Sequence, residues 1–208
     1  MMKWLVNNWY KATIFAAIYS LLFIFLFVYE QDFALFLIWL HVPVYLLHEF
    51  EEFVFPGGFP EMMTEMLVGK GHEVSYALKR AGFWVNVPFI FFGFPFVAAL
   101  ATLLGLSWGM YVVYFTLIAT IPHLLSAVKN KKLYNPGMFA SVFLNIPVSV
   151  YTIYYFSSRD LVSVRAHAIG LIVAMGAMAG PMILLIKKAQ KEISKEGINE
   201  VNDTLNVA

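Results

Sequence analysis

The sequence lacks cysteine and carries little charge. No cysteine occurs among its 208 residues, so the chain has no disulfide, no thiolate metal ligand and no cysteine nucleophile. A metal ion would have to be held by His, Asp, Glu or Asn. Fourteen Lys and Arg residues against 13 Asp and Glu give a net charge of +1. This balance provides no basic surface to neutralise phosphates, which excludes a nucleic-acid partner.

Apolar residues are abundant instead. They make up 61% of the chain against 13% charged residues, and the mean hydropathy is +0.73, far from the balance of a water-soluble domain. Aromatic residues reach 17%, which suits helices that face acyl chains and anchor at both interfaces. The composition predicts an all-α, polytopic transmembrane helical bundle whose main partner is the lipid bilayer.

Six apolar stretches are long enough to cross a bilayer core of roughly 30 Å. They predict a single transmembrane domain over residues 1–188, followed by a polar cytoplasmic tail over 189–208. No signal-peptide cleavage pattern follows the first stretch, which we therefore interpret as an anchor. Prolines inside several stretches predict kinks, because neighbouring helices can satisfy the freed carbonyls. The predicted spans are 12–28, 33–53, 82–104, 108–128, 137–156 and 166–186.

Lys and Arg are distributed unequally between the connecting segments. Ten of them lie before the first span or after the second, fourth and sixth, whereas the opposite loops carry Arg159 and Arg165. Because cytoplasmic segments are enriched in Lys and Arg, we predict that both termini face the cytoplasm. The ten residues are Lys3, Lys11, Lys70, Lys79, Arg80, Lys129, Lys131, Lys132, Lys187 and Lys188.

The second predicted span ends in the segment HEFEE, residues 48–52. On a helix, His48 and Glu52 are about 40° apart around the axis, and Glu51 lies about 60° to the other side of His48. His41 lies about 20° from His48 and about two turns deeper. Ionisable groups at such depth are costly in lipid and are typical of functional sites. Alternatively, the glutamates form a solvated helix terminus, although the helix dipole disfavours carboxylates there without a cation.

Three later spans carry polar residues at a matching depth. Asn86, His123 and Asn145 each lie within about 5 to 12 Å of the same boundary as His48, although buried His and Asn residues also satisfy carbonyls at proline kinks. We expect His72 and His167 to be loop or interface residues. The element YNPG, residues 134–137, is typical of a turn that opens the fifth helix with Asn135 as its N-cap. That helix N-terminus could also hold an anion.

The strings HEFEEFVFPGGFP and HLLSAVKNKKLYNPG resemble the HXXEE-domain family of small prokaryotic membrane proteins. The similarity covers most of residues 41–155, and the defining positions would be His48, Glu51 and Glu52. The resemblance implies a multi-pass protein of the prokaryotic plasma membrane. It implies no activity, because the family is essentially uncharacterised.

The residues themselves favour a metal-dependent hydrolase. Imidazole and carboxylate ligands suit zinc first, with iron and manganese as alternatives. We predict that His48, Glu52 and His123 bind the ion. We predict that Glu51 is the catalytic base, or that it accepts a hydrogen bond from the second ring nitrogen of a ligand histidine. His41, Asn86 and Asn145 are additional candidate site residues. A site just inside the cytoplasmic leaflet predicts a lipid-like or membrane-associated substrate that reaches it from the cytoplasmic side.

Two other functions remain open from the sequence. Adjacent glutamates with His and Asn on later helices are similar in part to the metal-free CAAX-type intramembrane proteases, but the Arg expected after the glutamates is absent. Paired glutamates and histidines can also carry protons or metal ions in a transporter. A transport site lies near the bilayer midplane, which only His41 approaches, and the two halves of the chain show no internal repeat. Oligomeric state stays open.

Overall fold

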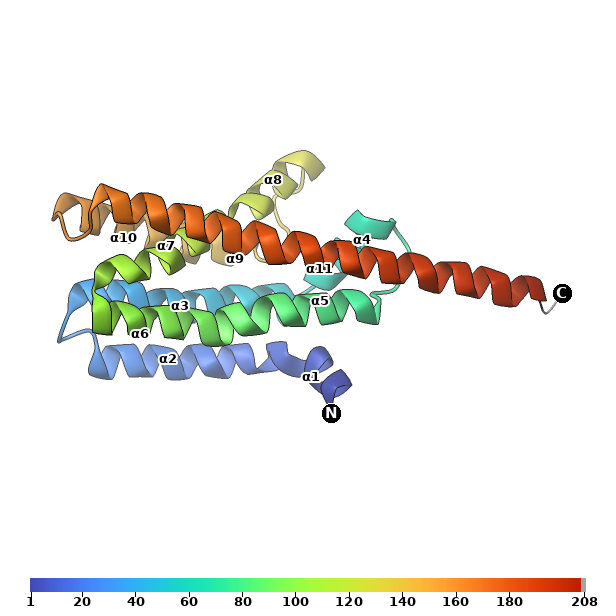
Figure 1. Ribbon diagram of the computed structural model, residues 1–208, viewed down its shortest axis with the longest axis horizontal. Coiled ribbons are helices and arrows are strands. Elements are labelled where there is room, and N and C mark those ends of the chain that lie inside the picture. The colour runs from blue at the N-terminus through green and yellow to red at the C-terminus, as the bar shows by residue number, and fades with distance from the viewer. Residues whose placement is uncertain (207–208) are drawn as a thin grey trace.

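A computed structural model describes the backbone of residues 1–206 and the side chains of those residues except 181, 182, 185, 189 and 192–206. Every regular element in this part of the chain is helical, and the long helices lie side by side in one bundle (Figure 1). The predicted all-α transmembrane bundle is confirmed. The long elements are α2 (Thr13–Phe27), α3 (Phe33–Phe53), α5 (Tyr76–Asn86), α6 (Phe94–Leu104), α7 (Met110–Ile118), α10 (Ile146–Ser158) and α11 (Val164–Asn206).

Shorter helical elements connect or extend these. They are α1 (Met2–Asn8), η1 (Trp9–Ala12), α4 (Phe59–Val68), η2 (Val87–Gly93), η3 (Leu106–Gly109), α8 (Ile121–Asn130), α9 (Met138–Ala140) and η4 (Ser141–Asn145). Five continuous helical stretches are long and apolar enough to span a membrane: Trp9–Phe27, Phe33–Phe53, Tyr76–Leu104, Leu106–Asn130 and Met138–Ser158. A sixth, Val164–Gly180, is apolar but shorter. The chain is therefore an integral, multi-pass membrane protein.

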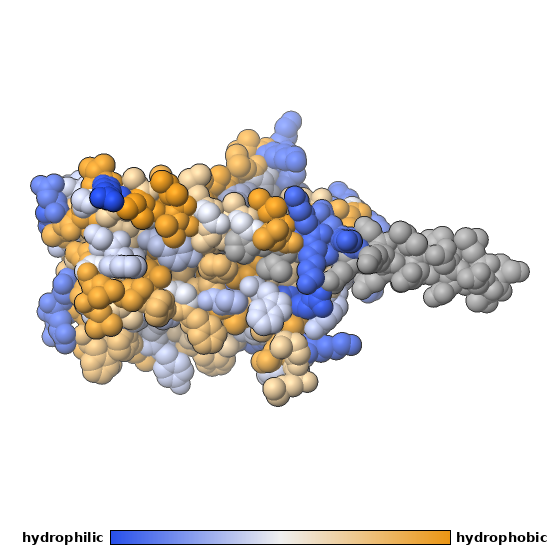
Figure 2. Space-filling view, in the orientation of Figure 1, coloured by the Kyte–Doolittle hydropathy of each residue, from blue (hydrophilic) through white to orange (hydrophobic). Residues whose placement is uncertain are grey.

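The surface agrees with this arrangement. On the face that Figure 2 shows, hydrophilic residues gather at the two ends of the bundle and hydrophobic residues lie between them. The sixth predicted span, 166–186, includes residues 181, 182 and 185, whose side chains lie outside the described part of the chain. The same holds for most side chains of the predicted tail, 189–208, although α11 continues as one helix to Asn206 and extends beyond the bundle (Figure 1).

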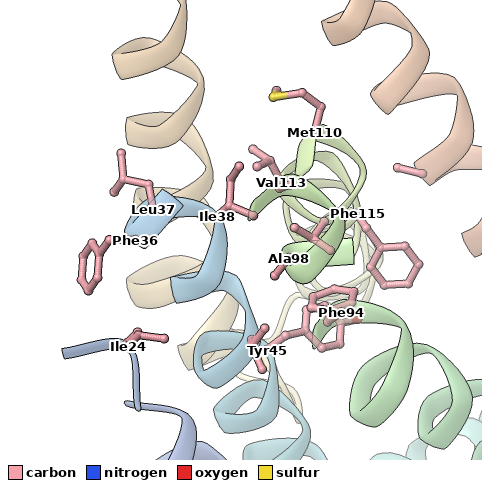
Figure 3. Packing of buried hydrophobic residues seen from close by; sticks show 14 of the residues in the cluster. Ile24, Phe36, Leu37, Ile38, Tyr45, Phe94, Ala98, Met110, Val113 and Phe115 are labelled. Carbon is pink, nitrogen blue, oxygen red and sulfur yellow. The ribbon is translucent and has the colours of Figure 1, made fainter. Parts of the chain in front are cut away.

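Helix α3 is the central helix of the bundle. Asp32 caps its start by accepting hydrogen bonds from the amides of Ala34 at 2.8 Å and Leu35 at 3.0 Å. Along α3, Tyr45 packs against Phe94 and Phe115 in the hydrophobic core (Figure 3). Most of the circumference of α3 is buried, whereas α2 is largely exposed. Polar side chains on α3 are consequently forced into the protein interior.

Prolines shape the helices that surround α3. The segments η2 and η4 are π-helical turns, one containing Pro88 and the other ending two residues before Pro147. A proline lacks an N–H group and its ring crowds a carbonyl of the preceding turn, so the helix widens locally. The chain also bends between α7 and α8, just before Pro122, and α8 diverges from the bundle (Figure 1). The helices are thus irregular near Pro88 and Pro147, and the chain bends before Pro122 (Figure 1).

Candidate metal centre

The HEFEE segment occupies the last two turns of α3 and is buried. His48 and Glu49 are each 1% exposed, Glu52 is 5% exposed and Glu51 is 6% exposed. The hypothesis of a solvated helix terminus is wrong for these side chains. Since buried carboxylates need compensating partners, the contacts of each one indicate its role.

Glu52 lies between two histidines. Its Oε1 atom is 3.5 Å from Nε2 of His48, one turn earlier on α3, and 3.2 Å from Nε2 of His123 on α8. The two imidazole rings meet edge to face with their centres 4.9 Å apart. One ligand atom from each residue lies within 4.8 Å of the other two, and all three side chains are buried. The structure thus brings together the three metal ligands predicted from the sequence.

The distances from Glu52 to the two histidines fit a metal ion. Two ligand atoms about 2.1 Å from one zinc ion at a tetrahedral angle are about 3.4 Å apart. The two Glu52–histidine distances, 3.5 and 3.2 Å, lie on either side of that value. Two histidines and one carboxylate also leave a coordination position for water, as catalytic sites require.

Asn135 fixes the orientation of His123. Its side-chain nitrogen donates to the backbone carbonyl of His123 at 2.9 Å, so its Oδ1 faces Nδ1 of the same histidine, 3.0 Å away. Because Oδ1 only accepts, the hydrogen of the neutral imidazole is on Nδ1. The lone pair on Nε2 then faces the Glu52 carboxylate. Two acceptors at 3.2 Å repel unless a proton or a metal ion lies between them.

Gly137 closes the other side of the three ligands. A β-carbon at this position would stand 2.6 Å from Cε1 of His123, 2.9 Å from Cγ of Glu52 and 3.0 Å from Cε1 of His48. Its φ of +87° is also in the left-handed region that favours glycine. Gly137 is the N-cap residue of α9, so the prediction that Asn135 caps this helix is wrong. Within the YNPG element, Asn135 instead holds His123 by hydrogen bonds, and Gly137 allows the backbone to pass close to His123, Glu52 and His48.

Comparison with known proteins matches the region that carries these residues. Residues 39–152 match a family described as a protein of unknown function with HXXEE motif. The chain belongs to the HXXEE family. The motif corresponds to His48, Glu51 and Glu52, and the matched region also contains His123, Asn135 and Gly137. No curated protein and no solved structure matches the chain.

The middle glutamate of the HXXEE motif has different partners from the last. Glu51 accepts hydrogen bonds from the backbone amides of Phe139 at 2.9 Å and Ala140 at 2.6 Å, and Tyr134 donates its hydroxyl to it. A carboxylate at a helix start stabilises the free amides there. The anion predicted at this N-terminus is therefore supplied by the protein itself. Among the described contacts, Glu51 supports no histidine.

The sequence interpretation missed Glu49. This glutamate is as buried as His48, and its Oε2 has no hydrogen-bond partner among the described residues. It lies close enough to interact electrostatically with Glu52 and Tyr45. The signal was available, because positions 45, 49 and 52 share a helix face at spacings of four and three.

The other predicted site residues lie apart from the three ligands. His41 and Asn145 are fully buried deeper in the bundle, and Nε2 of His41 lies 3.4 Å from the Thr152 hydroxyl. Asn86 is half-buried at the end of α5 and shares no described contact with the ligands. His72 is exposed in a loop, and Nδ1 of His167 hydrogen-bonds Tyr114 at 3.0 Å, both as expected for loop and interface residues.

Proposed function

We propose that this HXXEE protein is a membrane-embedded, metal-dependent hydrolase whose divalent ion is held by His48, Glu52 and His123. The observation that supports it best is that Nε2 of His123 lies 3.2 Å from Oε1 of Glu52, while Nδ1 of the same ring is held 3.0 Å from Oδ1 of Asn135. A cation bound between Nε2 and the carboxylate uses this geometry as it stands. Zinc is the first choice for two histidines and a glutamate, and iron and manganese share this ligand preference.

Such an ion would act as a Lewis acid and lower the pKa of a water molecule bound to it. The reaction then needs a nearby carboxylate to accept a proton. The sequence predicted Glu51 for this role, but its two oxygens accept hydrogen bonds from α9. Glu49 is buried beside Glu52 and has an unpartnered oxygen. We therefore assign the proton acceptor to Glu49 and the positioning of the YNPG element to Glu51.

The place of the site indicates the substrate. His48 and Glu52 lie in the last two turns of α3, at the end of the bundle that also carries both chain termini (Figure 1). By the distribution of Lys and Arg this end faces the cytoplasm. His123 points inward from α8, while Leu124, Leu125 and Val128 of the same helix are exposed. A lipid-like substrate in the inner leaflet of a prokaryotic plasma membrane can approach along this helix.

The first test is metal content. Wild-type protein purified in detergent without chelators is analysed by inductively coupled plasma mass spectrometry, and the stripped protein is then titrated with Zn²⁺, Fe²⁺ and Mn²⁺. We expect one ion per chain in the wild type, loss of that ion in H48A, E52Q and H123A, and retention in H72A, whose histidine is exposed in a loop. Retained stoichiometric metal in all three ligand variants would contradict the assignment.

The second test is activity. The metal-loaded protein in vesicles is offered long-chain carboxylic esters, phosphoesters and amides, and the products are identified by mass spectrometry. We expect hydrolysis of one class, its loss in E52Q, and bound metal without activity in E49Q. Metal or proton flux across the vesicle membrane without hydrolysis would instead identify a transporter. Peptide cleavage by metal-free protein would identify a glutamate-type intramembrane protease.

A further inference from the structure

Three lysines lie together at the end of α8. Lys129 is in the last turn of the helix, Lys131 is its C-cap residue and Lys132 follows, and all three side chains are exposed. None of them forms an ion pair within the part of the chain that the structure describes. The sequence contains no Asp or Glu between Glu73 and Asp160, so the chain near these lysines carries no charge to balance them. We call the three lysines the basic cluster.

The backbone at Lys131 is unusual for a lysine. Its φ of +51° lies in the left-handed region, where glycine is the common residue after a helix. Its amide donates to the carbonyl of Val128 at 3.3 Å, and the amide of Lys132 donates to that of Ala127 at 3.1 Å. Lys129 already supplies the cation that the helix dipole favours at this end. A further lysine at a strained position therefore indicates that its charge meets an anionic partner.

The opposite side of α8 from the metal centre is apolar. Ile121, Leu124, Leu125 and Val128 are exposed, whereas His123 is buried. At 100° per residue the four apolar side chains share one sector, across the helix from His123. Helix α8 diverges from the bundle (Figure 1), and in Figure 2 its protruding part is hydrophobic toward the middle of the bundle and hydrophilic toward the chain termini. Such a helix lies at the edge of a bilayer with its apolar face among acyl chains.

Leu133 follows the basic cluster directly and is 98% exposed. Beside lipid headgroups, a leucine here can reach the acyl chains, while the long lysine side chains keep their ammonium groups at the polar surface. Tyr134, the next residue, is also exposed, and tyrosine is typical of this boundary. The basic cluster is therefore at the level of the headgroups.

The chemistry of this surface identifies its partner. A lipid of the cytoplasmic leaflet brings a phosphate to the basic cluster and acyl chains to Leu125, Val128 and Leu133. An acidic protein segment would supply the charge but no acyl chain. We propose that the basic cluster and these three apolar side chains bind an anionic phospholipid. That this lipid is also the substrate rests on the proposed function, but its binding does not.

The experiment is native mass spectrometry of the protein in an uncharged detergent. The protein is titrated with phosphatidylglycerol or with phosphatidylcholine of the same acyl chains. Each lysine near an anionic headgroup strengthens binding about fivefold, so three give up to about 100-fold, and we expect a preference for phosphatidylglycerol of at least about tenfold. K129Q/K131Q/K132Q should bind both lipids nearly equally. K129R/K131R/K132R keeps the charge and should keep the preference.

K3Q/K11Q/K79Q is the matched control. It removes the same charge from three other exposed lysines, and the segment with Lys3 and Lys11 lies on the opposite side of the bundle from α8 (Figure 1). This variant should keep the preference. Leu133→Ser should weaken both lipids alike, because it removes an apolar contact and no charge. E52Q should lose the metal and keep the preference, so failure of the hydrolase proposal and failure of lipid binding give different results.

Equal binding of the two lipids by wild-type protein would overturn the proposal, whatever the variants do. A preference that K3Q/K11Q/K79Q loses as fully as K129Q/K131Q/K132Q would also overturn it, because the charge would then act from a distance and not at α8. Inorganic phosphate should displace phosphatidylglycerol no better than sodium chloride at the same ionic strength. Stronger displacement by phosphate would mean that the basic cluster binds the free anion and not a lipid.

Discussion

Gly137 and His123 approach so closely that a β-carbon on the glycine would stand 2.6 Å from Cε1 of the histidine. The glycine thereby belongs to the metal centre without offering a ligand. Two residues of the YNPG element after α8 thus act on His123. Asn135 orients its ring, and Gly137 leaves room for it.

Gly137→Ala should displace all three ligands. The new methyl group would also add left-handed backbone strain of about 1–2 kcal/mol. We expect at least a tenfold loss of metal affinity, measured by titration of stripped protein. Gly69→Ala is the control, because Gly69 has a φ of +102° but no atom within 4 Å of its β-carbon position. Equal loss of affinity in both variants would mean that strain, and not the close approach, causes the effect.

Asn135→Leu should weaken metal binding without removing a ligand. The variant loses the hydrogen bond that holds Nδ1 of His123, and loss of such a supporting partner costs about 10–100-fold in metal affinity. Asn135→Asp keeps the acceptor and should retain most of the affinity. Titrations of both variants with Zn²⁺ measure the difference. Wild-type affinity in Asn135→Leu would contradict the orienting role.

Glu51→Gln and Glu52→Gln should fail in different ways. Glutamine at 51 turns one acceptor into a donor that faces a backbone amide of α9, so stability should fall by about 1–3 kcal/mol while the metal is retained. Glutamine at 52 removes the charged ligand and the metal itself. Elemental analysis measures the bound metal of each variant, and unfolding in detergent measures its stability. If Glu51→Gln instead keeps wild-type stability and loses only activity, Glu51 is the catalytic base that the sequence predicted.

Tyr134 should titrate abnormally. Burial, followed by the nearby Glu51 carboxylate and its hydrogen bond, raises the pKa of Tyr134 from 10.0 to about 12. A raised pKa means that folding favours the neutral phenol, so its contribution to stability is complete below pH 10 and disappears as the pH rises to 12. Carbon-13 NMR of the tyrosine rings, with Y134F assigning the signal, measures this titration. Glu51→Gln should lower the pKa part of the way to 10; an unchanged value would contradict the contact.

The orientation in the membrane can be tested because the chain has no native cysteine. Single cysteines at Lys131 or Lys188 should react with an impermeant maleimide only from the cytoplasmic side, and those at Gln31 or Ser158 only from outside. All four side chains are exposed, so burial does not limit labelling. Reaction of a cysteine at position 31 from the cytosol would reverse the orientation.

The sequence by itself determined the membrane fold and singled out the three residues that the structure brings together as a candidate metal centre. In a bilayer every backbone polar group must be satisfied within a helix, so apolar runs of sufficient length define the spans directly. Helical periodicity placed His48 and Glu52 on one face and separated Glu51 from Glu52 by about 100°, which predicted different roles for the two carboxylates. In the structure their contacts differ, since Glu52 lies between two histidines and Glu51 accepts from backbone amides of α9.

Only the tertiary structure decided what those partners are. Glu51 accepts from the amides of Phe139 and Ala140 because the chain returns to the end of α3 after α8, through the YNPG element and α9. Helical periodicity does not specify this return. The burial of Glu49 likewise depends on which helices surround α3. Sequence spacing fixes directions around one helix axis, whereas contacts between helices depend on how distant segments pack.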